Sequence, residues 1–233
     1  MNLQGKTVTI IGAAKSGVAA ANLVLELGGI PKITDSKPLT DIERALKGLK
    51  DRTHVVIEAG ANTKDFVLAS DLVVVSPGVR RDAEPLQWAR EKGIPVVGEI
   101  EFAWRYCKKP VIAVTGSNGK TTTVTLIVKV LEAGGKKVEL CGNVGTPFSQ
   151  RVLSKDADFF IVEVSSFQLE LIVTFHPYIS VFLNINQMLC DELDKFGEKT
   201  GGWRQNSIVS QKLMNFGSSD YSRRNGVIDI FSF

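Results

Sequence analysis

The feature of this sequence that most constrains its fold is a regular alternation of short apolar runs with helical segments. The helical segments include residues 16–27 and 84–92, and the apolar runs lie at residues 6–12, 30–34, 55–58, 71–75 and 95–97. Strands that are apolar along their whole length are typical of parallel sheets covered by helices on both faces. Residues 1–98 therefore predict a doubly wound α/β domain with a Rossmann-like parallel sheet.

The same alternation restarts after a short polar joint at Cys107-Lys108-Lys109-Pro110. A helix at 99–106 precedes the joint, a helix at 120–133 follows it, and the apolar runs lie at 111–115, 137–140, 158–164 and 178–185. We therefore expect a first domain at 1–108 and a second, P-loop-type α/β ATPase domain at 109–186, which looks incomplete. The stretch 187–233 is polar and without long periodic segments, and it predicts a divergent tail with no third domain.

Composition places the chain among soluble globular proteins and excludes several functions. With 233 residues, 44% of them hydrophobic and 23% charged, the chain can build a packed core. A net charge of +3 is too small for a nucleic-acid binder. The three cysteines form no CxxC pair, which excludes a zinc site or disulfide framework built from them alone. No apolar stretch reaches the roughly 18 residues of a membrane helix, so we expect a cytoplasmic chain without membrane insertion.

The first glycine loop, Gly12-Ala13-Ala14-Lys15-Ser16-Gly17, lies between the first strand and the first helix. Ala14 stands where the GxGxxG dinucleotide fingerprint has its second glycine, so that fingerprint is broken. What remains is a helix N-terminus whose N–H groups can bind an anion beside the Ser16 hydroxyl. A plain strand-to-helix turn is the alternative.

Two further features follow strands of the same domain. Asp35 ends the second strand, where a carboxylate can accept hydrogen bonds from a nucleoside or cap the next turn. The turn Ser76-Pro77-Gly78 follows the fourth strand, and its N–H groups can face a phosphate or simply reverse the chain. Open α/β sheets bind ligands at this edge, so these loops together predict a nucleotide site.

The most specific motif is Val114-Thr-Gly-Ser-Asn-Gly-Lys-Thr-Thr-Thr123, a glycine loop between a buried strand and a helix. Such a loop offers N–H groups to phosphates, the Lys120 ammonium to their charge and the Thr121 hydroxyl to Mg²⁺. It is two residues shorter than a Walker A loop. Glu163 ends a later apolar strand, which predicts a carboxylate at the same edge within reach of that metal. His54 and His176 are predicted to be surface or turn residues.

Together these motifs resemble the Mur ligases of peptidoglycan synthesis over about residues 3–186. The resemblance rests on their order, which continues with Gly142-Asn-Val-Gly-Thr-Pro147, Glu163-Val-Ser-Ser-Phe-Gln-Leu169 and Leu183-Asn-Ile185. Two of these segments, 142–147 and 165–169, are most similar to those of the D-glutamate-adding members of the family. The family implies an ATP-dependent ligase that phosphorylates a carboxylate and then forms an amide.

The resemblance also implies substrates and site residues. The substrates would be ATP, UDP-N-acetylmuramoyl-L-alanine and D-glutamate, with Mg²⁺ as cofactor and a monomer as the working unit. The UDP end would lie on Ser16, Asp35, Ser36, Ser76, Pro77 and Gly78. The ATP phosphates would lie on Gly116, Ser117, Asn118, Gly119, Lys120, Thr121 and Thr122. Thr121 and Glu163 would hold the metal, Lys120 and Glu163 would be catalytic, and the muramoyl part and its metals would face Asn143, Ser165 and Gln168.

The sequence departs from the family after Ile185. In the family a motif Asp-His-Leu-Asp follows, whose histidine binds a second Mg²⁺. The nearest counterpart here is Asp191-Glu-Leu-Asp194, with Glu192 in place of the histidine, and Lys212 is a loose candidate for a carbamylated lysine. We therefore expect a truncated ligase with a frameshift near 187.

Four alternatives to a D-glutamate ligase stay open. They are a nucleotide-binding fragment without turnover, another Mur ligase, a folylpolyglutamate synthase and an NAD-dependent dehydrogenase. Residues 1–98 disfavour the synthase, which should lack a nucleotide-binding domain in front of its phosphate loop, and Ala14 disfavours the dehydrogenase.

Overall fold

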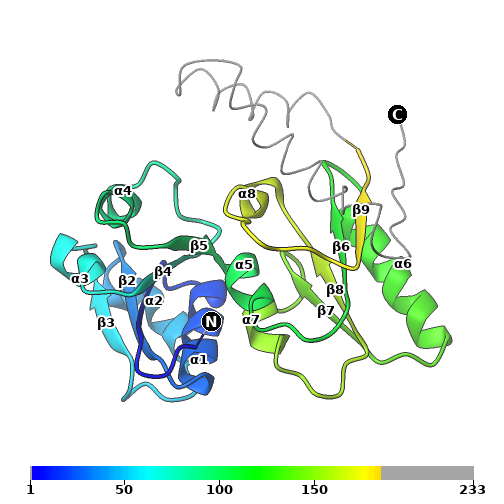
Figure 1. Ribbon diagram of the computed structural model, residues 1–233, viewed down its shortest axis with the longest axis horizontal. Helices are drawn as coiled ribbons and strands as arrows, with labels where there is room; N and C mark the ends of the chain where they lie inside the picture. The colour runs from blue at the N-terminus through cyan, green and yellow to red at the C-terminus, as the bar shows by residue number, and fades with distance from the viewer. Residues whose placement is uncertain (1, 185–233) are drawn as a thin grey trace. The chain divides into compact units, whose positions relative to one another are not determined.

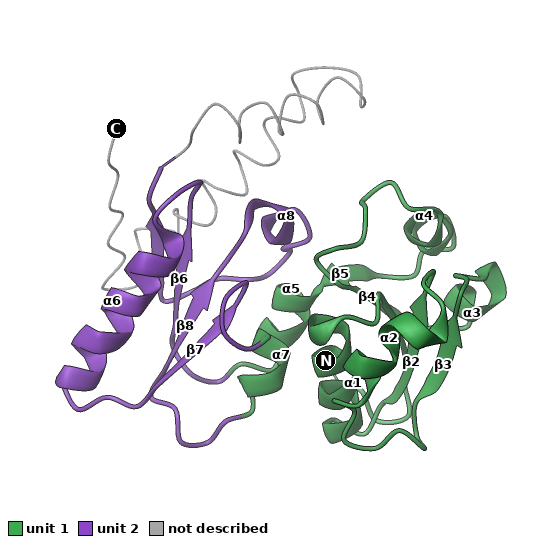
Figure 2. Ribbon diagram, turned by 180° about the vertical axis from the view of Figure 1, so that it is seen from behind, with its two compact units in different colours: residues 1–107, 147–153 green, residues 108–146, 154–233 purple. Residues whose placement is uncertain are grey.

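The computed structural model describes residues 2–184, and its chain divides into two compact units (Figures 1 and 2). Unit 1 comprises residues 1–107 and 147–153, and unit 2 comprises residues 108–146 and those from 154 onward. Cys107 is thus the last residue of the first stretch of unit 1. The segment 147–153, which the sequence analysis placed with the second domain, groups with the first. The predicted tail at 187–233, including Glu192 and Lys212, lies outside the described residues.

Unit 1 is built on a five-stranded parallel sheet with the strand order β3-β2-β1-β4-β5. This order is that of a Rossmann-type sheet, in which β2 and β3 are added on one side of β1 and β4 and β5 on the other. The side chains of β4 are all buried, and so are those of β1 after its first residue, as expected for strands covered on both faces. The strands are β1 (Thr7–Ile11), β2 (Ile30–Asp35), β3 (Val56–Ala59), β4 (Leu72–Val75) and β5 (Val96–Gly98).

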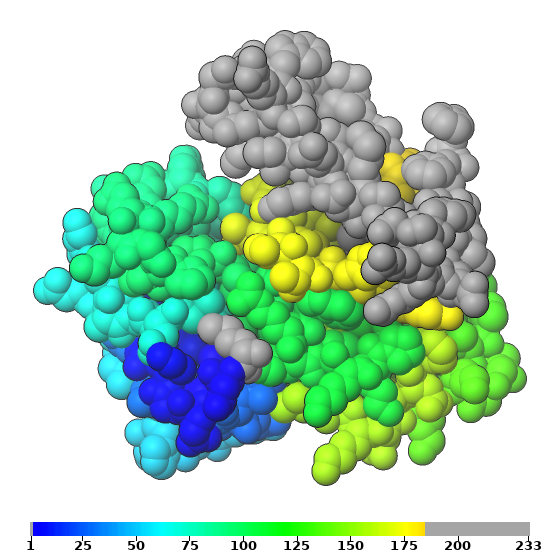
Figure 3. All heavy atoms as spheres, viewed as in Figure 1, coloured from blue at the N-terminus to red at the C-terminus, as the bar shows by residue number. Residues whose placement is uncertain are grey.

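Helices connect and cover these strands. Helix α1 (Lys15–Glu26) buries every residue from Gly17 to Val24 and contacts α2, α5 and α7, while α3 packs with α4. The remaining helices of the unit are α2 (Leu39–Leu46), α3 (Lys64–Leu68), α4 (Glu84–Glu91), α5 (Glu99–Trp104) and α7 (Phe148–Arg151). Residues 4–6, within the dark blue start of the chain, are exposed on this unit (Figure 3).

A buried carboxyl group anchors α7 to the rest of unit 1. Glu99 at the start of α5 is 2% exposed, and its Oε1 accepts a hydrogen bond from the Ser149 backbone N–H at 2.6 Å. Among the described residues its Oε2 has no hydrogen-bond partner. Burial therefore raises the pKa of Glu99 above its usual value, although the bonds to Ser149 act in the opposite direction.

Unit 2 contains a four-stranded parallel sheet with the order β7-β8-β6-β9. Its core is formed by Ile112, Val114, Ile161 and Val181 of the sheet together with Val124 of α6. Helix α6 (Lys120–Ala133) packs against β6, β7 and β8. The other elements are β6 (Val111–Thr115), β7 (Val138–Gly142), β8 (Phe159–Glu163), α8 (Ser166–Leu169) and β9 (Ile179–Phe182).

The sequence expectations were wrong at several elements. Helices α2, α3, α7 and α8 were not predicted, because all but α2 have only four or five residues. The strand expected at 178–185 is shorter, since β9 ends at Phe182. The next residue, Leu183, still donates its N–H to the Thr115 carbonyl at 3.0 Å.

In the described part of the chain, no helix has the length and apolar character needed to cross a membrane.

Candidate functional site

The phosphate loop of unit 2 presents a helix N-terminus to any bound anion. Gly116 and Gly119 have φ angles of 140° and 84°, which only glycine adopts readily, and α6 begins directly afterwards at Lys120. The first N–H to bond within the helix is that of Thr123, which donates to the Gly119 carbonyl at 2.9 Å. The N–H groups of residues 119–122 therefore lack a partner inside the helix, and the positive end of its dipole lies there. This is the geometry of a phosphate site.

The Lys120 side chain lies across the same loop. Its Nζ donates to the carbonyl oxygens of Gly116 and Ser117 at 2.6 and 3.1 Å. A positive charge is thus held beside the helix N-terminus, where the negative charge of a phosphate would be stabilised.

Glu163, at the end of β8, meets the start of α6. Its Oε2 accepts a hydrogen bond from Thr121 Oγ1 at 2.9 Å, and its Oε1 accepts one from Asn143 Nδ2 at 2.9 Å. Glu163 is 1% exposed, so both carboxylate oxygens are fixed in a buried position. The structure therefore brings together three residues that the sequence analysis had selected from distant segments.

This arrangement fits a hard divalent cation. Because Thr121 gives its hydroxyl proton to Glu163, its oxygen lone pairs stay available to a metal, and Mg²⁺ prefers such oxygen ligands. The buried carboxylate supplies negative charge behind that oxygen. Between residues 2 and 184 no group of three or more His, Cys, Asp or Glu is placed to bind a metal, so phosphate and water oxygens would complete the shell.

Ser165 and Gln168 engage each other at the turn that follows β8. The Ser165 N–H donates to Gln168 Oε1 at 2.9 Å and the Ser165 hydroxyl donates to the same oxygen at 3.1 Å. Together they form a capping box at the N-terminus of α8. These hydrogen bonds therefore fix the turn between β8 and α8.

Asn184 is a residue of this site that the sequence analysis missed, since it appeared there only within a motif. It follows β9, the strand next to β6, and its side chain bonds to the backbone of Asn118. The available signal was a polar residue directly after an apolar strand, because the carboxyl ends of parallel strands meet at one edge.

The predicted loops of unit 1 also meet at the carboxyl edge of their sheet. Asp35 accepts the N–H of Ala13 at 2.7 Å and that of Lys37 at 2.9 Å. The buried Ser76 hydroxyl donates to the Gly12 carbonyl at 2.8 Å. The polar groups of these loops therefore stabilise one another. Of the serines singled out beside them, Ser16 is half-buried and Ser36 is exposed.

A cavity of about 430 Å³ lies beside the first loop of unit 1. Its lining combines the helix N-terminus with three basic residues and two carboxylates, Asp35 and Asp41, so both phosphate-binding and hydroxyl-binding groups face the cavity. Two of these basic residues, Lys37 and Arg44, were missed by the sequence analysis; Arg44 lies on α2, which was not predicted, and Lys37 lies in the turn before it. The cavity is lined by Ala13, Ala14, Lys15, Asp35, Lys37, Asp41, Ile42, Arg44 and Ala45.

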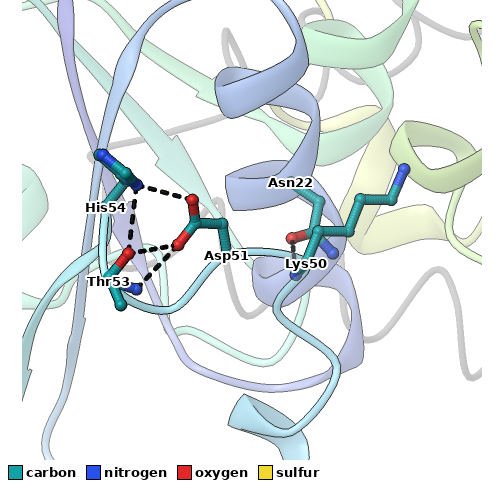
Figure 4. A network of polar contacts seen from close by, with 5 residues as sticks. All are labelled: Asn22, Lys50, Asp51, Thr53 and His54. Atoms are coloured by element: carbon teal, nitrogen blue, oxygen red, sulfur yellow. Dashed lines mark hydrogen bonds and ion pairs between the residues drawn. The ribbon is translucent and has the colours of Figure 1, made fainter.

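Both histidines are exposed, as predicted. His54 Nδ1 lies 2.6 Å from an Asp51 carboxylate oxygen and 3.2 Å from the Thr53 hydroxyl (Figure 4). The bonds from Thr53 and His54 lower the pKa of Asp51 to about 2. All three residues belong to one exposed turn, so this network stabilises the turn and carries no catalytic interpretation.

Comparison with known families gives the class of protein that this fold and these sites define. Residues 6–98 match the family model described as "Mur ligase MurD-like, N-terminal domain", and residues 114–199 match the one described as "Mur ligase middle domain". The chain belongs to the Mur ligase family.

Within that family the curated relatives include D-glutamate ligases. UDP-N-acetylmuramoylalanine–D-glutamate ligase of Koribacter versatilis is 39% identical over 219 residues, which cover 93% of this chain and 48% of that protein. The enzyme of the same name from Desulfosudis oleivorans is 42% identical over 185 residues, covering 78% of this chain and 40% of that protein. The chain thus spans about half the length of the curated relatives it matches.

Solved structures support the fold. UDP-N-acetylmuramate-alanine ligase MurC from Thermotoga maritima aligns with a TM-score of 0.54 at 18% identity, over 91% of this chain and 47% of that one. A murein peptide ligase from Psychrobacter arcticus aligns with a TM-score of 0.51 at 20% identity, over 91% of this chain and 46% of that one. The α/β architecture with parallel sheets is therefore confirmed.

Proposed function

We propose that this chain acts in peptidoglycan precursor synthesis as an ATP-dependent ligase that adds D-glutamate to UDP-N-acetylmuramoyl-L-alanine. The observation that carries the proposal is the Thr121–Glu163 pair beside Lys120, in a chain whose residues 6–98 match a MurD-like N-terminal domain. In the proposed reaction a carboxylate oxygen of the muramoyl-alanine attacks the γ-phosphorus of ATP and ADP leaves. The D-glutamate amine then attacks the acyl carbon, loses a proton and expels phosphate.

The phosphate loop would hold ATP through the N–H groups at the start of α6. Lys120 would leave the Gly116 and Ser117 carbonyls and donate to phosphate oxygens, stabilising the charge on the transferred group. Thr121 would hold Mg²⁺ directly, with Glu163 orienting the hydroxyl from behind. When bound, the metal would supply charge neutralisation on the phosphates. Gly116, Ser117, Asn118, Gly119 and Thr122 complete the proposed ATP site.

The loops of unit 1 would hold the UDP end of the other substrate. A helix N-terminus, the carboxylate of Asp35 and the basic residues of the cavity suit a uridine with two phosphates. Ser16, Ser36 and the Ser76-Pro77-Gly78 turn belong to the same proposed site. Asn143, Ser165 and Gln168 are proposed to face the muramoyl part. Because the proposed reaction consumes ATP, which cells keep inside, the cytoplasm is the proposed location. The monomer is the proposed working unit.

Calorimetric titration of the chain with UDP-N-acetylmuramoyl-L-alanine and, separately, with NAD tests the unit 1 assignment. We expect binding of the UDP compound, no measurable binding of NAD, and loss of the UDP signal in Asp35→Ala. Asp65→Ala, which removes a carboxylate from α3 of the same unit outside the cavity lining, is the matched control and should bind as wild type. Preference for NAD would contradict the proposal. A chain that binds the UDP compound and MgADP but forms no amide with D-glutamate and MgATP would instead support a binding fragment without turnover.

A further inference from the structure

We propose that Asn184 is a positioning residue that holds the phosphate loop in its anion-binding shape. This inference rests on the ATP site proposed above and adds a residue to it. Asn184 and Asn118 are separated by 66 positions in the sequence, yet both the oxygen and the nitrogen of the Asn184 side-chain amide bond to the backbone of Asn118. The Asn118 N–H donates to Asn184 Oδ1 at 2.9 Å, and Asn184 Nδ2 donates to the Asn118 carbonyl at 3.1 Å.

The backbone of Asn184 adds a third bond to the loop. Its carbonyl accepts the N–H of Ser117 at 2.9 Å, directly after the bond between the Leu183 N–H and the Thr115 carbonyl. The pairing between β6 and β9 therefore continues past the end of both strands. The side-chain amide takes the place of one more backbone unit in this ladder, since it offers both a donor and an acceptor.

This clamp divides the loop into two parts with different tasks. The N–H groups of Ser117 and Asn118 already have acceptors on Asn184, whereas those of residues 119–122 lie at the open end of α6. The carbonyls of Gly116 and Ser117 are turned toward the Lys120 ammonium. The phosphates would therefore be bound by the second part, while the first part fixes its curvature.

The close approach of Asn184 to the phosphate loop also explains why position 116 is a glycine. A Cβ on Gly116 would lie 3.1 Å from the Asn184 backbone nitrogen and 3.2 Å from its oxygen, at a φ of 140° that other residues rarely adopt. Gly116 thus allows the segment after β9 to lie against the loop. We infer that preorganisation by Asn184 removes part of the ordering cost that phosphate binding would otherwise carry.

Three variants of the whole chain test this role by calorimetric titration with MgADP. Asn184→Ala removes the side-chain clamp, and Asn184→Leu removes it with a side chain of the same branching and number of heavy atoms, so the two variants together separate the lost bonds from an empty space. We expect both to weaken MgADP binding by about 10- to 100-fold, the size of losing two hydrogen bonds that order the site.

Asn22→Ala is the matched control. In unit 1, Asn22 makes the same kind of two-ended clamp, because its side chain donates to the Gly48 carbonyl at 2.9 Å. It also accepts the Lys50 N–H at 2.9 Å (Figure 4). Its loss should lower the thermal midpoint of unfolding and leave MgADP affinity within about twofold of wild type. Folded Asn184 variants with wild-type affinity would overturn the inference. A wild-type chain that does not bind MgADP would overturn the proposed nucleotide site itself, and the inference with it.

Amide hydrogen exchange in the wild-type chain tests the same claim without a variant that must fold. The amides of Ser117 and Asn118 should exchange slowly before nucleotide is added, and those of residues 119–122 should slow only after MgADP binds. Rapid exchange at 117 and 118 in the free chain, with slowing on MgADP, would contradict the clamp.

Discussion

The two units use the same element, a glycine loop between the first strand of a parallel sheet and a helix, and they stabilise it in different ways. In unit 1 the loop is held by the Asp35 carboxylate and the Ser76 hydroxyl, which come from the strands on either side of β1. In unit 2 it is held by the neutral amide of Asn184, while the buried Glu163 bonds to Thr121. Both loops leave a helix N-terminus open, but only the loop of unit 2 pairs a buried carboxylate with a hydroxyl that could hold a metal.

Similar loop backbones can thus serve different anions. A carboxylate held against the first loop disfavours a bare phosphate there but suits the hydroxyls of a nucleoside. A neutral clamp on the second loop adds no negative charge where phosphates and Mg²⁺ would lie. The difference predicts that substitutions in one loop affect the ligand of that loop alone.

The largest effect is expected for Gly17→Ala in unit 1. A Cβ at this position would lie 1.9 Å from the Gly12 carbonyl oxygen, which is backbone and cannot move aside cheaply. We expect the free energy of unfolding of unit 1 to fall by about 3 kcal/mol, at the upper end for an overpacked core. Urea unfolding followed by circular dichroism measures it. Gly78→Ala, where no atom lies within 4 Å of the added Cβ, is the control and should change stability little.

An effect of similar size in unit 2 is expected for Lys120→Ala. The substitution removes the ammonium that lies across the phosphate loop, and we expect MgADP affinity to fall about 100-fold, as for a lost charge-assisted bond. Binding of UDP-N-acetylmuramoyl-L-alanine should not change. Lys129→Ala, farther along α6 and exposed, is the control. Equal MgADP affinity of Lys120→Ala and wild type would show that the loop binds no phosphate.

Much of this architecture could be predicted from sequence, for identifiable physical reasons. The strands β1, β4, β6 and β8 are buried along all or nearly all of their length and are therefore rich in Val and Ile, so their runs stand out in the sequence. The helix α2 also carried a signal that was missed, with Leu39, Ile42 and Leu46 spaced as on one helix face. The four-residue helices α7 and α8 are too short for any periodicity.

The candidate sites were predictable as motifs but not as contacts. Lys120 and Thr121 follow from the loop motif, and Glu163 from its place at a strand end. The bonds of Asn184 to the loop depend on strand order, because β9 must lie beside β6 rather than at the far edge. Nothing local to Asn184 specifies that order.

A smaller effect is expected in the pH dependence of unit 1. The folded-state pKa of Glu99 is raised, so the folded chain keeps its proton above pH 4.5, where the unfolded chain loses it. Stability is therefore fully present below that pH and falls as pH rises toward the folded pKa. Glu99→Gln should abolish this fall. Between pH 4 and pH 8, the free energy of unfolding of the variant should therefore rise relative to that of wild type by about 1–3 kcal/mol, the cost of an unpaired buried acceptor. Identical pH profiles for the two proteins would contradict the assignment.

The smallest effect is expected for Asp51→Asn on the exposed turn of Figure 4. The pKa of Asp51 is lowered to about 2. Its carboxylate therefore contributes to folding stability above pH 3.8, and this contribution is lost as the pH falls through 2. Thermal midpoints of variant and wild type should differ slightly at pH 6, and the difference should shrink as the pH falls and vanish below pH 2. Because the group is exposed, this variant is also the control for Glu99→Gln, with the opposite dependence on pH.

We expect the two loops to bind two different nucleotides independently, and sequential calorimetric titration of one sample measures whether they do. The chain is first saturated with UDP-N-acetylmuramoyl-L-alanine and then titrated with MgADP, and the order is reversed in a second sample. One equivalent of each ligand should bind in either order, with both remaining bound. Displacement of the first ligand by the second, or binding of only one equivalent in total, would contradict it.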